Sequence, residues 1–126
     1  MRSWLAVLLL AVGGAHGAHA QEGFPLDGTW RGLRQTAGEA PVTIVIVMQW
    51  DGQKVSGIIN PGPKAIAIGD VELVPQTWHV AVTARAPSGE PITFQGVLGQ
   101  LGSYNRSITG TWTQGGHSYP VRIVRE

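Results

Sequence analysis

The feature that most constrains the fold is a series of short alternating segments separated by turn residues. Every second residue from Val42 to Trp50 is apolar, and the segment from Trp78 to Ala84 repeats the pattern. A period of two places such residues on one face of a β-strand. No segment keeps the spacing of an amphipathic helix for long. The sequence therefore predicts an all-β protein.

Turn signals divide the chain into about eight short strands. Asp51-Gly52 is a strong hairpin signal, and Gly or Pro clusters near 61–63, 87–89, 99–102 and 115–116 mark further turns. Connections this short favour an antiparallel up-and-down meander, since parallel pairs need long crossovers. Eight strands can close, or nearly close, into a small barrel without exposed edges. A flattened or half-open barrel is the alternative, because Pro61 and Pro63 cannot pair within a central strand.

The first segment predicts export. Arg2 precedes the apolar run Leu5–Val12, and Ala18-His19-Ala20 matches the small-x-small cleavage rule, so residues 1–20 are expected to be a cleaved signal peptide. The single domain would then span residues 21–126. With no cysteine there is no lipid attachment site and no disulfide. We expect a periplasmic or secreted protein.

The charge of the mature chain excludes several partner classes. Loss of Arg2 with the signal leaves eight basic residues against eight acidic ones. Nucleic-acid binding needs a basic face, and a polybasic membrane patch needs an excess of Lys and Arg. We therefore expect neither a nucleic acid nor a membrane as partner. A length of 106 residues after cleavage of 20 from 126 suits one domain.

Large aromatic residues share the predicted inner face. Strand parity places four tryptophans there with Met48 and Phe94, so the candidate ligand-binding residues are Trp30, Met48, Trp50, Trp78, Phe94 and Trp112. They predict either a cavity for a small apolar or aromatic ligand, or simply the large side chains that fill a small barrel. Four glycines share the inner rows and either leave room for a ligand or accommodate neighbouring indoles and the bends of a strongly curved sheet: Gly28, Gly57, Gly96 and Gly110.

The Gly28-Thr29-Trp30 motif, followed by a meander, resembles the calycin pattern of lipocalins and avidin-like barrels. In lipocalins the first-strand Trp closes one barrel end and an Arg of the last strand covers it. The resemblance implies this closing role for Trp30 and Arg125, with Arg122 as the other choice. A guanidinium over an indole makes a favourable cation–π contact.

Longer segments resemble a small secreted bacterial β-domain that often precedes an exported α/β-hydrolase and also occurs alone. They cover most of the mature chain: DGTWRG, QKVSG, FQGVLGQL and SITGTWTQGGHSYPVRIVR. The chain holds no Gly-x-Ser-x-Gly nucleophile elbow. The resemblance therefore implies a fold and an export route and no hydrolase reaction.

No catalytic or metal-binding constellation is visible in the sequence. His79 and His117 are the histidines of the mature chain, and both are expected on the surface. Asp27, Asp51 and Asp70 adjoin glycines, as ordinary turn residues do. A metal site needs three or four converging ligands, which no segment offers. We expect no catalytic residues, no metal and no cofactor.

Three functions remain open. The first is a non-enzymatic exported barrel that binds a small apolar ligand. The second is a ligand-free structural or interaction module, a monomer or weak dimer that contacts another exported protein. Its docking face would consist of apolar residues of outer parity: Leu33, Val45, Val47, Ile58 and Val97. The third, an enzyme that uses a histidine, has the least support. A cavity would favour the first, and a filled interior with an exposed apolar patch the second.

Overall fold

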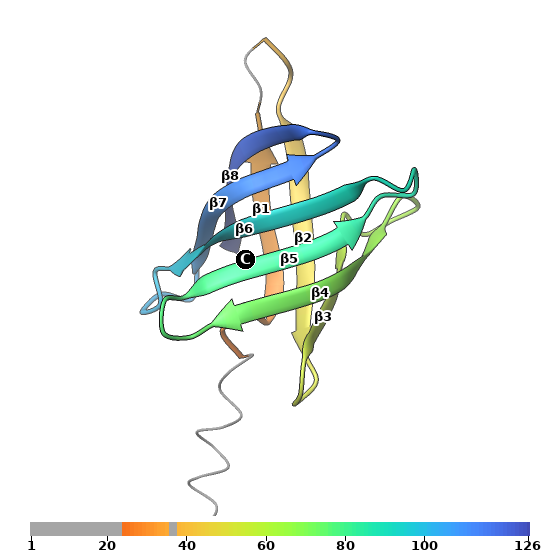
Figure 1. Cartoon of the computed structure of the whole chain (residues 1–126). Coiled ribbons are helices and arrows are strands. Elements are labelled where there is room, and N and C mark those ends of the chain that lie inside the picture. Colours follow the sequence, from red (N-terminus) through yellow and green to blue (C-terminus); the bar gives the residue numbers. More distant parts are fainter. Residues whose placement is uncertain (1–23, 36–37) are drawn as a thin grey trace, which may run out of the picture.

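The computed structural model describes residues 24–35 and 38–126. The predicted signal peptide, residues 1–20, lies outside the described residues. A short 3-10 turn, η1, precedes eight strands that follow one another in sequence order (Figure 1). The element bounds are η1 Phe24–Leu26, β1 Gly28–Arg34, β2 Val42–Trp50, β3 Val55–Ile59, β4 Ile66–Val74, β5 His79–Arg85, β6 Pro91–Gly99, β7 Ser107–Gln114 and β8 His117–Arg125.

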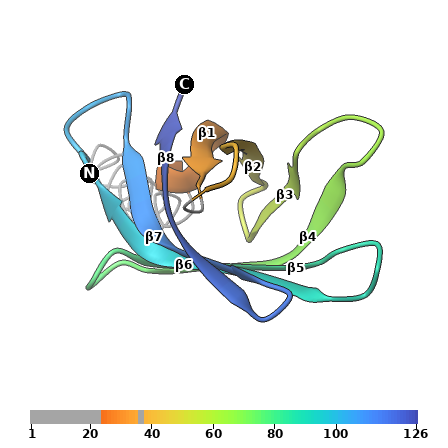
Figure 2. The ribbon, with the colours of Figure 1, turned by 90° about the horizontal axis from the view of Figure 1, so that it is seen from above.

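The strands form a closed antiparallel barrel, which confirms the predicted all-β meander. Each strand pairs with the next, and β1 also pairs with β8, where Trp30 lies opposite Arg125. In Figure 2 β1 accordingly lies between β8 and β2. The weakest seam joins β3 to β4 through two residue pairs, Ile58 with Ala67 and Ile59 with Ile66. The Pro-rich turn thus shortens one ladder without preventing closure.

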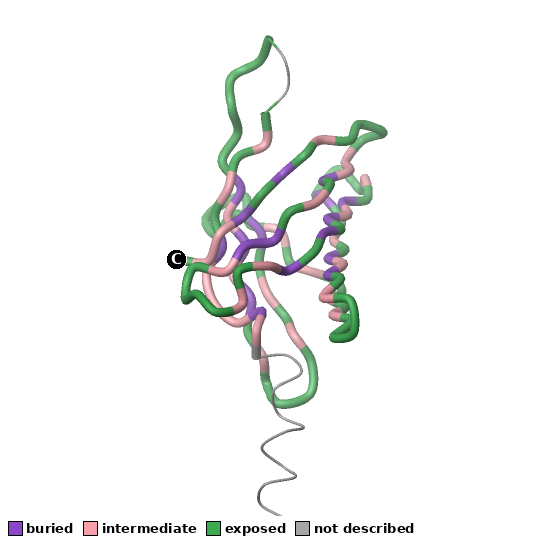
Figure 3. Tube along the Cα trace, turned by 90° about the vertical axis from the view of Figure 1, so that its left-hand side faces the viewer, coloured by how far each residue is buried: buried purple, intermediate pink, exposed green. Residues whose placement is uncertain are grey.

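Residues of alternate parity fill the barrel, as the sequence pattern predicted. Buried and exposed residues alternate along the strands (Figure 3). The buried core includes Ile46, Val82, Ile108 and Ile123, each at most 2% exposed. Full burial of such an aliphatic side chain contributes about 1.5–3 kcal/mol. The interior of the barrel is therefore the hydrophobic core of the protein.

The alternation from Trp78 to Ala84, part of a strand expected over Gln76 to Arg85, predicts a strand start that is wrong. Residues 75–78 form a turn, and β5 begins only at His79. The backbone of Trp78 has φ of 58°, a left-handed conformation that a strand does not contain. Sequence parity alone could not detect this, because Trp78 continues the apolar alternation across the turn.

Candidate functional site

Four of the six candidate ligand-binding residues pack together in the core. Trp30 is fully buried, and Met48, Phe94 and Trp112 are at most 3% exposed. Phe94 and Trp112 are cross-strand partners, with ring centroids 6.1 Å apart. The Trp30 indole Nε1 donates a 2.9 Å hydrogen bond to the Leu26 carbonyl oxygen. These side chains themselves fill the space inside the barrel.

The other two candidates lie at one end of the barrel. Trp50 ends β2 and Trp78 precedes β5, and both are half-buried. Trp78 packs against the edge of the core together with Val55 and Leu73. The end of β2 and the start of β5 lie at the same end of an up-and-down meander. The structure therefore divides the six candidates into four core residues and two residues near solvent.

The inner-row glycines lie where backbones approach closely, so they do not open a cavity. A Cβ at Gly96 would lie 2.6 Å from the carbonyl oxygen of Thr109. A Cβ at Gly110 would overlap the carbonyl oxygen of Gln95, and one at Gly57 would overlap that of Val47. In each case the neighbouring strand occupies the space that a side chain would need. These three positions favour the bending role over the ligand role.

Arg125 crosses the barrel end at which β1 begins. Its side chain passes Gly28 so closely that a Cβ there would lie 2.9 Å from Arg125 Cδ. Its Nε donates to the Tyr104 carbonyl oxygen at 3.0 Å, and its Nη1 to that of Asp27 at 3.3 Å. The guanidinium lies 4.6 Å from the ring centroid of Tyr104. The cation–π contact at this end thus uses Tyr104, while Trp30 is Arg125's backbone neighbour and Arg122 is exposed.

A second arginine, Arg106, forms a hydrogen bond at the same end of the barrel. Arg106 Nη1 donates to the Pro25 carbonyl oxygen at 3.3 Å, which ties the start of β7 to η1. Burial lowers the pKa of Arg106, and the positive charge of Arg125 lowers it further. Both arginines thus donate hydrogen bonds to backbone carbonyls near the first turn, Arg106 to Pro25 and Arg125 to Asp27.

A polar network at the opposite end was missed by sequence reasoning. Arg34 lies 4.5 Å from the centroid of the Tyr119 ring, and its Nη1 lies 3.5 Å from Gln114 Oε1. The same oxygen accepts a 3.0 Å bond from Trp112 Nε1, and Gln114 Nε2 donates to Glu90 Oε1 at 2.9 Å. The available signal was parity, because Arg34 is four residues after Trp30 on the same strand. The network joins β1, β7, β8 and the β5–β6 turn.

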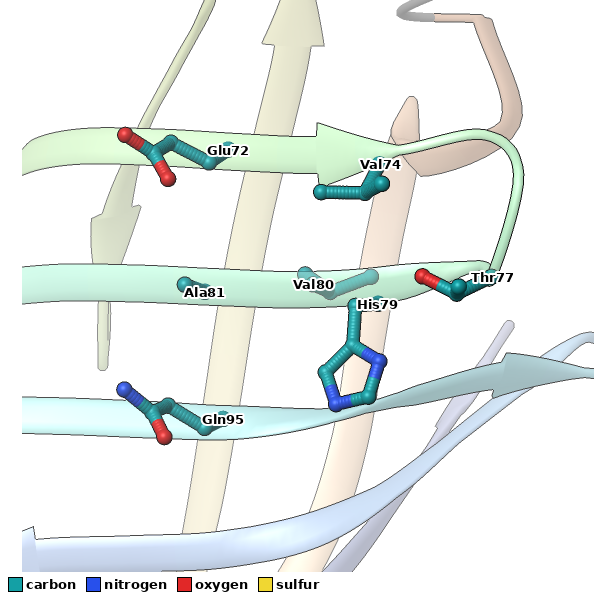
Figure 4. Close-up of a pocket in the computed structure, with 7 residues that line it drawn as sticks. All are labelled: Glu72, Val74, Thr77, His79, Val80, Ala81 and Gln95. Carbon is teal, nitrogen blue, oxygen red and sulfur yellow. The ribbon is translucent and has the colours of Figure 1, made fainter.

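Two hollows lined by described residues lie on the outer face of β4–β6. The first, of about 280 Å³, has Ala81 as its floor, between Glu72 and Gln95 of the neighbouring strands. His79 and Thr77 complete its rim (Figure 4). The second, of about 460 Å³, is lined by Gly69 of β4 and by residues of β5 and β6, among them Thr83 and Thr93. Neither includes one of the four core candidates, and the polar side chains of the first are exposed. Such open hollows do not exclude water from bound molecules.

The histidines are far from a catalytic arrangement. Both are exposed, and His117 Nδ1 lies 3.0 Å from the Gly115 carbonyl oxygen, within its own turn. Its ring stacks near Tyr119, with centroids 6.4 Å apart. No group of three His, Cys, Asp or Glu residues in the described part of the chain could hold a metal ion. Asp27 and Asp51 accept backbone hydrogen bonds, from Trp50 and from Gln53 and Lys54 respectively.

Comparisons with family models, curated proteins and solved structures find no match for this chain. Among the helices of residues 24–35 and 38–126, none has the length and apolar character needed to cross a membrane.

Proposed function

We propose that the protein is an exported, non-enzymatic β-barrel that acts as an interaction module through its outer surface. The observation that carries the proposal is the filled interior. Trp30, Met48, Phe94 and Trp112 pack against one another and their neighbours with at most 3% of their surface exposed. A ligand between them would have to displace core side chains. We therefore expect contacts with a partner on the outer surface of the barrel.

The outer face of β1–β3 is the favoured contact surface. Leu33 and Ile58 are 53% and 42% exposed, and Val47 lies beside Ile58 in register. Val45 is half-buried on the same strand. Val97, the fifth residue of the predicted docking face, is separate: it lies on β6 between His79 and Thr109. We call the four remaining residues, Leu33, Val45, Val47 and Ile58, the β1–β3 face.

The resemblance to the exported β-domain supports this role. That domain often stands ahead of a secreted hydrolase, where it is an accessory unit rather than the reacting one. A partner of this chain would accordingly be another exported protein, and the chain itself a monomer or weak dimer.

Mass measurement of the protein purified from its export compartment tests the proposal. Native conditions should show a complex with another protein that denaturation separates, and no small-molecule adduct. The double variant Leu33→Lys/Ile58→Lys should lose the complex and keep the wild-type circular dichroism spectrum. Val97→Lys, which changes an equally exposed valine on the other side, should retain the complex. A complex that survives the double variant would refute the β1–β3 face.

A second function, binding of a small apolar ligand, is favoured by one observation. Trp50 and Trp78 are half-buried at the same barrel end, and the inward-facing residues Val55, Val71 and Leu73 are also half-buried there. A ligand would contact these residues instead of the core tryptophans. A reproducible small-molecule adduct in the native spectrum, abolished by Trp78→Ala, would establish this function in place of the first.

A further inference from the structure

One strand edge of the barrel stays open. β4 pairs with β5 from Ile68 to Val74, but it pairs with β3 only at Ile66 and Ala67. Beyond their shared turn the two strands diverge (Figure 1). Among the described residues, no strand pairs with the β3-facing side of residues Asp70–Val74. We call these five residues the β4 edge.

A bulge accounts for the divergence. The register between β4 and β5 shifts between Ile68 and Asp70, so Gly69 is an additional residue in β4. A bulge bends its strand and increases the local twist. Only one atom, the Thr83 carbonyl oxygen at 3.4 Å, lies within 4 Å of a Cβ built at Gly69. The bend directs the rest of β4 away from the short strand β3.

The side chains of the β4 edge alternate in character. Val71 and Leu73 face inward and are half-buried, while Asp70 and Glu72 are exposed on the outer face. An unpaired strand edge offers its N–H and C=O groups to an added strand, and alternate side chains then decide which sequence fits. The complement of this edge is an extended segment with apolar residues opposite Val71 and Leu73 and basic residues opposite the two acids.

The same charges disfavour a second copy of the chain as the occupant. Antiparallel self-pairing of two β4 edges would place Asp70 or Glu72 opposite another acid or opposite Val74. Like charges directly opposite each other destabilise a strand pair. The acidic pattern therefore disfavours pairing between copies and favours a cationic partner as the complement.

We propose that the β4 edge binds an extended segment of alternating basic and apolar residues, which adds to the barrel as a further strand. The proposal rests on the interaction role proposed above and names a second contact site with its partner chemistry. Backbone hydrogen bonds to residues 70–74 hold the segment. Its Lys or Arg side chains lie beside Asp70 and Glu72, and its apolar side chains cover Val71 and Leu73.

The experiment titrates the full chain with a seven-residue peptide of alternating valine and lysine. Binding should slow hydrogen exchange at alternate amides of the β4 edge, because alternate residues direct their N–H groups to the same side. Two further peptides carry N-methyl groups, one on every valine and the other on every lysine. One of the two should lose binding and the other should keep it. Equal binding by both would overturn strand addition.

Charge variants test the partner chemistry. Asp70→Lys/Glu72→Lys should weaken binding of the lysine peptide about tenfold, as expected from the loss of two opposite-charge cross-strand pairs. It should also strengthen binding of the corresponding valine–glutamate peptide. Glu39→Lys/Glu126→Lys makes the same change in net charge at two exposed positions elsewhere and should leave the affinity unchanged. An equal loss in both variants would show attraction by net charge alone and refute the site.

The result is distinguishable from that of the mass experiment. No protection of the β4 edge, together with a complex that depends on Leu33 and Ile58, would refute this inference and leave the interaction role in place. Protection of the β4 edge with no complex lost in the Leu33→Lys/Ile58→Lys variant would refute the β1–β3 face and support this edge.

Discussion

Substitution of Gly96 by alanine tests whether neighbouring backbone occupies the space that a side chain would need at the inner glycines. A Cβ at this position would lie 2.6 Å from the Thr109 carbonyl oxygen and 3.0 Å from Ile108 Cγ2. Carbon contacts are optimal at about 3.5–4.0 Å, so β6 and β7 would have to separate by about 0.5–1 Å where Gly96 pairs with Gly110. Overpacking of this kind costs about 1–3 kcal/mol, and the lower entropy of the unfolded alanine chain offsets about 0.4–1 kcal/mol.

The net expectation for Gly96→Ala is a free energy of unfolding lower by about 1.3 kcal/mol, the difference between the midpoints of these two ranges. For a domain of this size the Tm should fall by about 5–10 °C. Urea unfolding followed by tryptophan fluorescence should show a lower midpoint at an unchanged slope. Gly99→Ala is the matched control on the same strand, since its Cβ would lie 3.7 Å from Ser107 Oγ, an ordinary contact. If both variants are as stable as the wild type, the glycines border empty space and the filled-barrel argument fails.

Three further variants test individual contacts. Gln114→Leu removes the acceptor of the Trp112 indole N–H and should lower the free energy of unfolding by about 1–3 kcal/mol. The control Thr111→Val, at an outward position, should change the free energy of unfolding by less than about 0.5 kcal/mol. Equal effects of the two variants would contradict the network. Trp30→Phe leaves the Leu26 carbonyl without its donor and should cost about 1–3 kcal/mol in the same urea assay, so an unchanged midpoint would argue against this bond. The backbone amides of Lys54 and Gln53 lower the pKa of Asp51 below its ordinary value of 3.8. The ionised carboxylate therefore stabilises the fold at pH values above the pKa of the unfolded chain. This stabilisation is lost as the pH falls through the lower pKa of the folded protein. Asp51→Asn should therefore be less stable than the wild type at neutral pH and approach it in acid, and a constant difference across this range would refute the linkage.

Strand parity could be predicted from the sequence, and pairing register could not. The alternation around Met48 and Phe94 identified inward residues because each strand has one buried face. Val97 was grouped with Leu33 because both have outer parity, yet β7 and β8 separate their strands. Which outer residues are neighbours depends on the order and register of the strands, which parity does not give.

The features missed at the barrel ends have local causes. Trp78 keeps the apolar alternation while its backbone enters a turn. Arg34 and Gln114 are polar residues of inward parity that satisfy each other at the mouth, and hydrophobic patterning does not detect them. The open β4 edge follows from a one-residue bulge at Gly69, which composition shows only as another glycine.

The pairing of β1 with β8 has a consequence for how the chain acquires its structure. Trp30 and Arg125 become neighbours although 95 residues separate them, so the last strand must be present before the first can complete its ladder. Such distant pairings slow folding. In a chain that emerges N-terminus first, one edge of β1 would stay unpaired until β8 has been synthesised. Assembly of this barrel therefore depends on delivery of its last strand, the nine residues His117–Arg125. A nascent chain halted before this strand would remain an aggregation-prone intermediate.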